Sequence, residues 1–204
     1  MTTRLLSRLL SLWAVYSASG AVASPVLTFD PSRGGTGLNH DQTVGWEFDV
    51  VAPVAVTHLA WFDQDRDGLS TSHRVGLWDS TGRLLADAAV PQGAEAVLDD
   101  IWRIVPITQV TLLVGRGYLI GGMNYAASTD RIAGGVLDHV VDPRVAYGGS
   151  RYAMPGTGFS APTHVSAGIN GLYGPSFNVV AVPEPACILL GGAALLVVTW
   201  RRRF

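Results

Sequence analysis

The sequence predicts an all-β domain, an antiparallel β-sandwich of jelly-roll-like form. Residues 43–50, TVGWEFDV, alternate between apolar and polar side chains, as a strand with one buried face does. Further short apolar segments follow at close spacing, separated by turn residues such as Pro53 and Gly82. The central region shows no long helical period. Short strands without intervening helices favour two sheets packed on each other.

The expected strands are rich in β-branched and aromatic residues and are bounded by Gly, Pro or Asp. In chain order they are residues 43–50, 54–62, 73–78, 84–90, 102–107, 110–114, 117–125 and 177–182. The turn at 79–82, Asp-Ser-Thr-Gly, predicts a hairpin, whereas Pro106 and the segment 115–117 are expected to separate strands. Residues 126–176 contain many Gly and Pro and predict loops with short strands.

The charge of the central region excludes one class of partner. All 14 basic residues are arginine, and five of them lie in the two ends of the chain. Residues 24–182 therefore hold nine arginines against fifteen of the 16 acids. Such an acidic domain has no basic stripe to displace phosphate counterions, so a nucleic-acid partner is not expected. The single cysteine, Cys187, lies outside this region, so the domain depends on a packed core and not on disulfides.

The N-terminal segment predicts export. Residues 1–23 have a basic start, an apolar run and the small residues Ala21-Val22-Ala23 before Ser24, which is the pattern of a secretory signal peptide. A membrane anchor is the alternative, but the apolar run is short for a span. We therefore expect a signal peptide over 1–23 and a β-sandwich domain over 24–181.

Residues 182–204 predict a short C-terminal transmembrane helix. Pro183, Glu184 and Pro185 precede an apolar stretch that runs from Ala186 to Trp200. As a helix this stretch would be about 22 Å long, against a hydrocarbon core of about 30 Å. Arg201, Arg202 and Arg203 follow, and such residues hold a helix end at the cytoplasmic interface. The domain would then lie outside the membrane.

The order of these parts, Pro-Glu-Pro, a short apolar helix and an arginine cluster, resembles the PEP-CTERM sorting signal. This class occurs in Gram-negative bacteria that make extracellular polysaccharide. The resemblance implies that Pro183, Glu184 and Pro185 form the motif recognised by a membrane-embedded processing enzyme, exosortase. It also implies that the tail is removed during sorting to the cell surface or the extracellular matrix.

The central region also resembles a bacterial domain of unknown function that often occurs on PEP-CTERM proteins. The resemblance implies a β-sandwich and no established activity. The stretches that carry it are VGWEFDV, LAWFDQDRDGLSTSHRVGLWDSTGRLLADAAVP, WRIVPI, GYLIGG and GLYGPSFNV.

An acidic segment follows the second expected strand. Asp63, Asp65, Asp67 and Gly68 have the spacing of a calcium loop, with alternate carboxylates and a glycine for the sharp turn. The twelfth position of an EF-hand requires a glutamate, and this chain has Arg74 there. The segment is therefore not an EF-hand, although it can still be part of a calcium site in a sandwich.

Such a site would need further ligands, which could be carbonyls, waters or a distant aspartate such as Asp99, Asp100 or Asp130. The alternative is a solvated turn, in which Asp and Gly are favoured for their backbone geometry. In that case the carboxylates need cations among them, and Arg66 and Arg74 are the expected ones. The sequence leaves both interpretations open, with calcium as the one candidate cofactor.

Catalytic motifs are mostly absent. The chain has no G-x-S-x-G or H-E-x-x-H, and its five histidines lack ligand spacing. His58 and His73 are expected to have structural roles. We therefore expect a non-enzymatic protein of the cell surface or matrix, associated with exopolysaccharide or biofilm. One alternative is a carbohydrate-binding module that uses tryptophans as stacking platforms, namely Trp61, Trp78 or Trp102. A hydrolase is a further alternative.

Overall fold

The computed structural model describes residues 22–33, 35–36, 40–136, 138–168 and 171–182. Residues 1–21 of the expected signal peptide lie outside these residues, as do the Pro-Glu-Pro motif, the expected C-terminal transmembrane helix and the terminal arginines. In the described part, no helix is long and apolar enough to cross a membrane.

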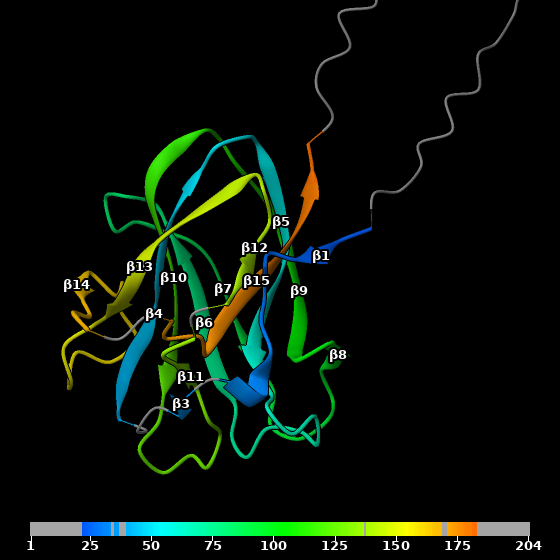
Figure 1. Ribbon diagram of the computed structural model, residues 1–204. Coiled ribbons are helices and arrows are strands. Elements are labelled where there is room, and N and C mark those ends of the chain that lie inside the picture. Colours follow the sequence, from blue (N-terminus) through cyan, green and yellow to red (C-terminus); the bar gives the residue numbers. More distant parts are fainter. Residues whose placement is uncertain (1–21, 34, 37–39, 137, 169–170, 183–204) are drawn as a thin grey trace, which may run out of the picture.

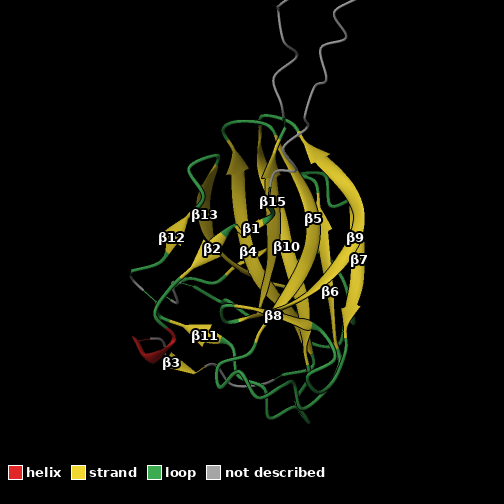
Figure 2. Cartoon of the chain, turned by 90° about the vertical axis from the view of Figure 1, so that its right-hand side faces the viewer, coloured by secondary structure: helices red, strands yellow, loops and turns green. Residues whose placement is uncertain are grey.

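The described residues form strands and one three-residue 3₁₀ helix, η1 (Figures 1 and 2). Their bounds are β1 (Ser24–Pro25), β2 (Leu27–Thr28), η1 (Pro31–Arg33), β3 (Gly35–Thr36), β4 (Gln42–Val50), β5 (Val54–Phe62), β6 (His73–Trp78), β7 (Leu84–Val90), β8 (Val97–Asp99), β9 (Trp102–Leu112), β10 (Gly115–Asn124), β11 (Ala133–Gly134), β12 (Val140–Val141), β13 (Val145–Tyr152), β14 (His164–Val165) and β15 (Pro175–Ala181).

Two antiparallel sheets enclose the core. One has five strands in the order β1-β15-β5-β9-β8, and the other has six in the order β14-β13-β4-β10-β6-β7. Two small two-stranded sheets, β11-β3 and β12-β2, lie beside them. The all-β, antiparallel prediction is therefore confirmed. Strands β5, β6 and β7 occupy the predicted residues, and β4 begins one residue before the predicted start.

Alternation along β4 builds the centre of the core. Val44, Trp46 and Phe48 are buried, while Glu47 and Asp49 on the other face are half-buried. The Trp46 ring stacks on Phe177 of the opposite sheet, with ring centroids 5.7 Å apart. Its Nε1 donates a hydrogen bond to the Pro175 carbonyl at 3.1 Å. One side chain thus joins the two sheets by packing and by a hydrogen bond.

Two expected strands, 102–107 and 110–114, form one strand in the structure. Strand β9 continues through Pro106, so the prediction of a break there is wrong. His58 of β5 pairs with Pro106, and Val56 pairs with Val110, which leaves a bulge between these pairs. The neighbouring strand β8 pairs only with the first residues of β9, Trp102 to Ile104. On that side of β9, no described strand pairs with Pro106. A proline is tolerated at such a position because it has no ladder hydrogen bond to lose.

Strand β13 was not predicted as a long strand. It pairs antiparallel along β4, and its sequence, VAYGGSRY, has no clean alternation because two glycines interrupt it. The register shifts between Tyr147 and Gly149, where Gly149 has a φ of 132°. This bulge shows that tertiary pairing, and not local pattern, makes the segment extended.

The sandwich has two distinguishable ends. The first and last described residues lie toward one end, which we call the tail pole (Figure 1). The β4–β5 loop (51–53) and the β9–β10 loop (113–114) lie at the same end. Strand β5 runs from that end to the opposite one, the distal pole, where residues 63–72 connect it to β6.

Candidate functional site: the acidic pocket

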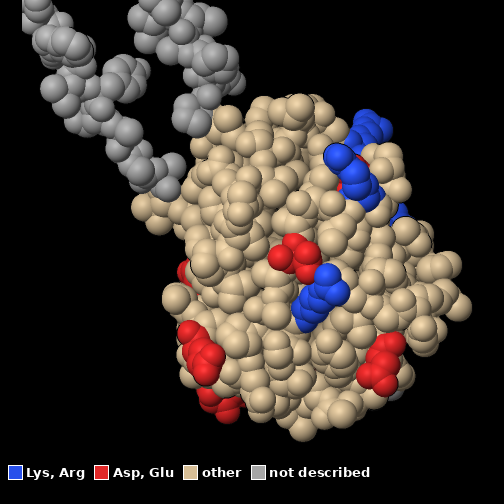
Figure 3. All heavy atoms as spheres, turned by 180° about the vertical axis from the view of Figure 1, so that it is seen from behind, with Lys and Arg blue, Asp and Glu red and all other residues tan. Residues whose placement is uncertain are grey.

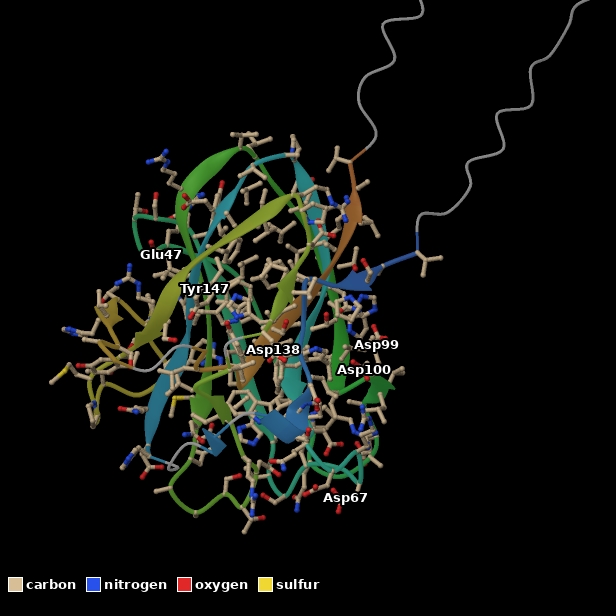
Figure 4. All side chains as sticks on the ribbon, viewed as in Figure 1. Glu47, Asp67, Asp99, Asp100, Asp138 and Tyr147 are labelled. Carbon is tan, nitrogen blue, oxygen red and sulfur yellow. The ribbon has the colours of Figure 1, made fainter. Side chains whose placement is uncertain are left out.

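A polar pocket of about 330 Å³ opens at the distal pole, in the region of Asp67 in Figure 4. The acidic segment 63–70 forms one side of it, and residues 129–131 form another. Gly93 completes the lining from a third segment. Asp63, Asp65, Asp67 and Asp130 thus border one cavity, as a site built from the acidic segment would require.

The Asp63 carboxylate is already paired. Asp63 is 4% exposed and Arg103 5%, and the Arg103 Nε donates to Asp63 Oδ2 at 2.7 Å. The Gly68 amide donates to the same oxygen at 3.0 Å. The remaining Arg103 nitrogens bond to the carbonyls of Ala96 and Arg66, both at 3.1 Å. Each of the three guanidinium nitrogens of this buried cation therefore donates to an acceptor.

The expected arginines have other partners. Arg66 forms an ion pair with Asp100 at 3.0 Å, and Arg74 pairs with Asp87 at 2.7 Å. The guanidinium of Arg74 also lies 4.2 Å from the centre of the Phe159 ring. Sequence reasoning missed Arg103 because its partner lies forty residues earlier in the chain. The register of β9 on β5, which pairs Trp61 with Arg103, would have revealed the pair.

Gly68 has a structural reason to be glycine. Its φ is 111°, a region that side chains rarely adopt, and a Cβ there would lie 2.7 Å from the carbonyl carbon of Gly93. Leu69 and Gly93 exchange backbone hydrogen bonds of 3.1 and 2.7 Å. The glycine thus permits the segment to pair closely with residue 93, whether or not a metal binds.

Asp130 is held from several sides at the back of the pocket. His73, which is fully buried, places Nε2 2.7 Å from Asp130 Oδ2. The amides of Ser70 and Thr71 donate to the two carboxylate oxygens at 2.6 and 3.1 Å, and the Ser128 hydroxyl donates at 2.9 Å. Burial raises the pKa of Asp130, but hydrogen bonds from His73, Ser70 and Ser128 outweigh it and lower the pKa to about 2.

Both ring nitrogens of His73 face acceptors. Nδ1 lies 2.7 Å from the Met123 carbonyl, which can only accept, and Nε2 faces the ionised Asp130. The ring also stacks on Trp61 with centroids 3.9 Å apart. His73 therefore has the structural role expected from sequence.

This arrangement does not suit a serine hydrolase. The Ser128 hydroxyl bonds to Asp130 and not to the histidine ring. A catalytic triad needs a histidine nitrogen that faces the serine, and both nitrogens of His73 are engaged elsewhere.

The predicted calcium ligands have different surroundings. Asp65 and Asp67 are exposed at the pocket, whereas Asp63 is turned inward to Arg103. Of the distant candidates, Asp99 accepts from Asn178 at 2.7 Å and Asp100 pairs with Arg66. Across the described ranges, no group of three or more His, Cys, Asp or Glu could hold a metal. The geometry favours the charged turn, with Arg103 as its cation.

Thermal unfolding distinguishes a calcium site from a charged turn. Because the carboxylate of Asp63 is engaged, we expect the melting temperature to be the same in EDTA and in millimolar calcium. A ligand at about 100 times its Kd would add about 2.7 kcal/mol, which a melt detects readily. The matched control is the variant Asp65→Ala/Asp67→Ala. A rise with calcium that this variant abolishes would establish a metal site instead.

The proposed sugar platforms are not exposed. Trp61 and Trp102 are fully buried and Trp78 is 3% exposed. Trp102 donates its Nε1 hydrogen to the Leu27 carbonyl at 3.0 Å, and Trp78 packs on Phe159. Stacking of sugar rings on these three tryptophans, as the sequence suggested, is therefore wrong for this fold.

Comparisons with known proteins add no relative. No family model matches the chain, and neither a curated protein nor a solved structure resembles it significantly. A function can therefore be inferred only from the sequence and the structure of this chain.

Proposed function

We propose that this chain is an exported, non-enzymatic protein of the cell surface or extracellular matrix, sorted through a PEP-CTERM tail. An exosortase-type enzyme would process the tail at the membrane, and exopolysaccharide or biofilm matrix would be its surroundings. The β domain, in this proposal, is the part that remains after processing.

The proposal rests on the position of the last paired strand residue before the tail. Strand β15 closes the five-stranded sheet, with Ala181 paired to Val54 and Val179 paired to Ser24. The last paired residue therefore lies two positions before Pro183. Loss of the tail breaks none of the strand pairs that the structure describes. A removable sorting tail requires such a boundary.

The order of strands supports a jelly-roll architecture. Strands β1, β15, β5 and β9 form one side, and β4, β10, β6 and β7 form the other. Strands β4 to β6 and β9 to β10 cross from one sheet to the other, while β6–β7, β8–β9 and β13–β14 pair within one sheet. This order matches the one expected of a double Greek key, with β13 and β14 added at an edge of one sheet and β8 at an edge of the other.

The position of the acidic pocket fits display at a surface. It opens at the distal pole, away from the end at which the tail begins. A domain held by its tail would therefore present the pocket to the surroundings.

Sorting can be tested by altering the motif. In a host with an exosortase-type enzyme, the unaltered chain should lose its tail and leave the membrane fraction. The variant Pro183→Ala/Glu184→Ala/Pro185→Ala should keep the tail and stay in the membrane, because its recognition motif is lost. Pro155→Ala, at an exposed loop position, is the matched control. Identical processing of the motif variant would contradict the proposal.

A further inference from the structure

The tail pole presents apolar side chains to the outside. Val51 is 54% exposed, Leu113 65% and Val114 64%. Strand pairing sets the two loops that carry them side by side, because Val50 pairs with Gly115 and Val54 with Leu112. Isolated exposed apolar residues are ordinary, but a group of them on adjacent loop tips marks an interaction surface.

The chain leaves the domain beside these loops. Ala181 pairs with Val54, so Val182 emerges next to the loop that carries Val51. Four residue steps separate Val182 from Ala186, where the apolar segment begins. Extended chain covers at most about 3.6 Å per residue, so the apolar segment starts within about 14 Å of the tail pole. The headgroup layer on one side of a bilayer is about 5–8 Å thick.

From this geometry we propose that the tail pole docks on the lipid bilayer. The side chains of Val51, Leu113 and Val114 enter the headgroup layer while the segment 186–200 spans the membrane. The proposal rests on the membrane anchorage proposed above and adds the orientation of the domain: upright, with the acidic pocket facing away from the lipid.

The charges agree with this orientation. Arg116 is 92% exposed and its neighbour Asp49 34%, while Arg144 is 24% exposed and its partner Asp142 10%. In each pair the cation is the more exposed member, so it faces lipid phosphates when the pole approaches the surface. On the face drawn in Figure 3, arginines lie at the upper right and near the centre, and most acidic residues lie in the lower half.

A site-specific fluorophore tests the docking. The full chain, with Cys187→Ser, receives a single cysteine for an environment-sensitive label and is reconstituted into phosphatidylcholine–phosphatidylglycerol vesicles. One variant is Leu113→Cys at the tail pole. The matched control is Ala127→Cys, which is also exposed but lies between β10 and Asp130 at the distal pole. We expect the Leu113 label to shift to shorter wavelength and to be quenched by nitroxide lipids. The Ala127 label should show neither change.

The other outcomes overturn the proposal in distinguishable ways. A chain that an alkaline wash releases from the vesicles contradicts both the anchor and the docking. A chain that stays bound while its Leu113 label reports water contradicts the docking alone. A shift that depends on protein concentration and not on nitroxide lipids would assign the surface to a second copy of the chain.

Discussion

Replacing Arg103 with methionine is expected to lower the free energy of unfolding by about 3–5 kcal/mol, because it leaves a buried carboxylate without its cation. The Arg103 and Asp63 side chains are 6% and 3% exposed, and among the described residues no other cation forms an ion pair with Asp63. Methionine keeps much of the volume, so the loss reflects the removed charge and its hydrogen bonds to Asp63, Ala96 and Arg66, and not a cavity. Chemical denaturation followed by intrinsic fluorescence gives the difference.

Two further variants isolate the pair. Arg66→Met removes an ion pair whose members are 47% and 48% exposed, and it should cost at most about 1 kcal/mol. The double variant Asp63→Leu/Arg103→Met removes both buried charges and should be more stable than Arg103→Met alone. Equal losses from Arg103→Met and Arg66→Met would show that the buried pair has no special role.

Replacing Asp130 with alanine is expected to lower the free energy of unfolding by a similar amount, again about 3–5 kcal/mol. It leaves the His73 ring, the amides of Ser70 and Thr71, and the Ser128 hydroxyl without their shared acceptor. Asp87→Ala, which removes the partner of the half-exposed Arg74, is the control and should have a small effect.

Lowering the pH should reproduce part of this loss of stability. The pKa of Asp130 falls from 3.8 to about 2 in the folded protein. A carboxyl whose folded pKa is lowered stabilises the fold above its unfolded pKa and loses that contribution as pH falls through the folded value. The unaltered protein should therefore lose stability between about pH 4 and pH 2, and Asp130→Ala should lose less over that window. Parallel curves for the two proteins would contradict the account.

The sequence was most informative where local pattern and fold agree. The alternation of Val44, Trp46 and Phe48 predicted β4 and its buried face, because one-sided burial imposes a period of two. It was least informative where pairing with a neighbouring strand determines the conformation of a segment. The extended form of β13 comes from its pairing with β4, and the continuity of β9 through Pro106 comes from a free edge.

The candidate site shows the same limit. The acidic segment was visible in the sequence, and its position after β5 followed from the strand pattern. Its cation, Arg103, was not, because that pairing depends on the register of β9 on β5. For the same reason the sequence alone left the exposure of Trp61 and Trp102 open, and the structure shows that both are buried. A pattern shows which face a residue takes, but not whether another layer covers that face.

We propose that a self-contained sandwich, Ser24 to Ala181, is separated from its tail during export. The most direct measurement is the intact mass of the protein recovered from the outside of cells that export and process it. The account predicts a mass that lacks residues 1–23 and the apolar segment 186–200. A surface form that still contains the segment 186–200 would contradict it.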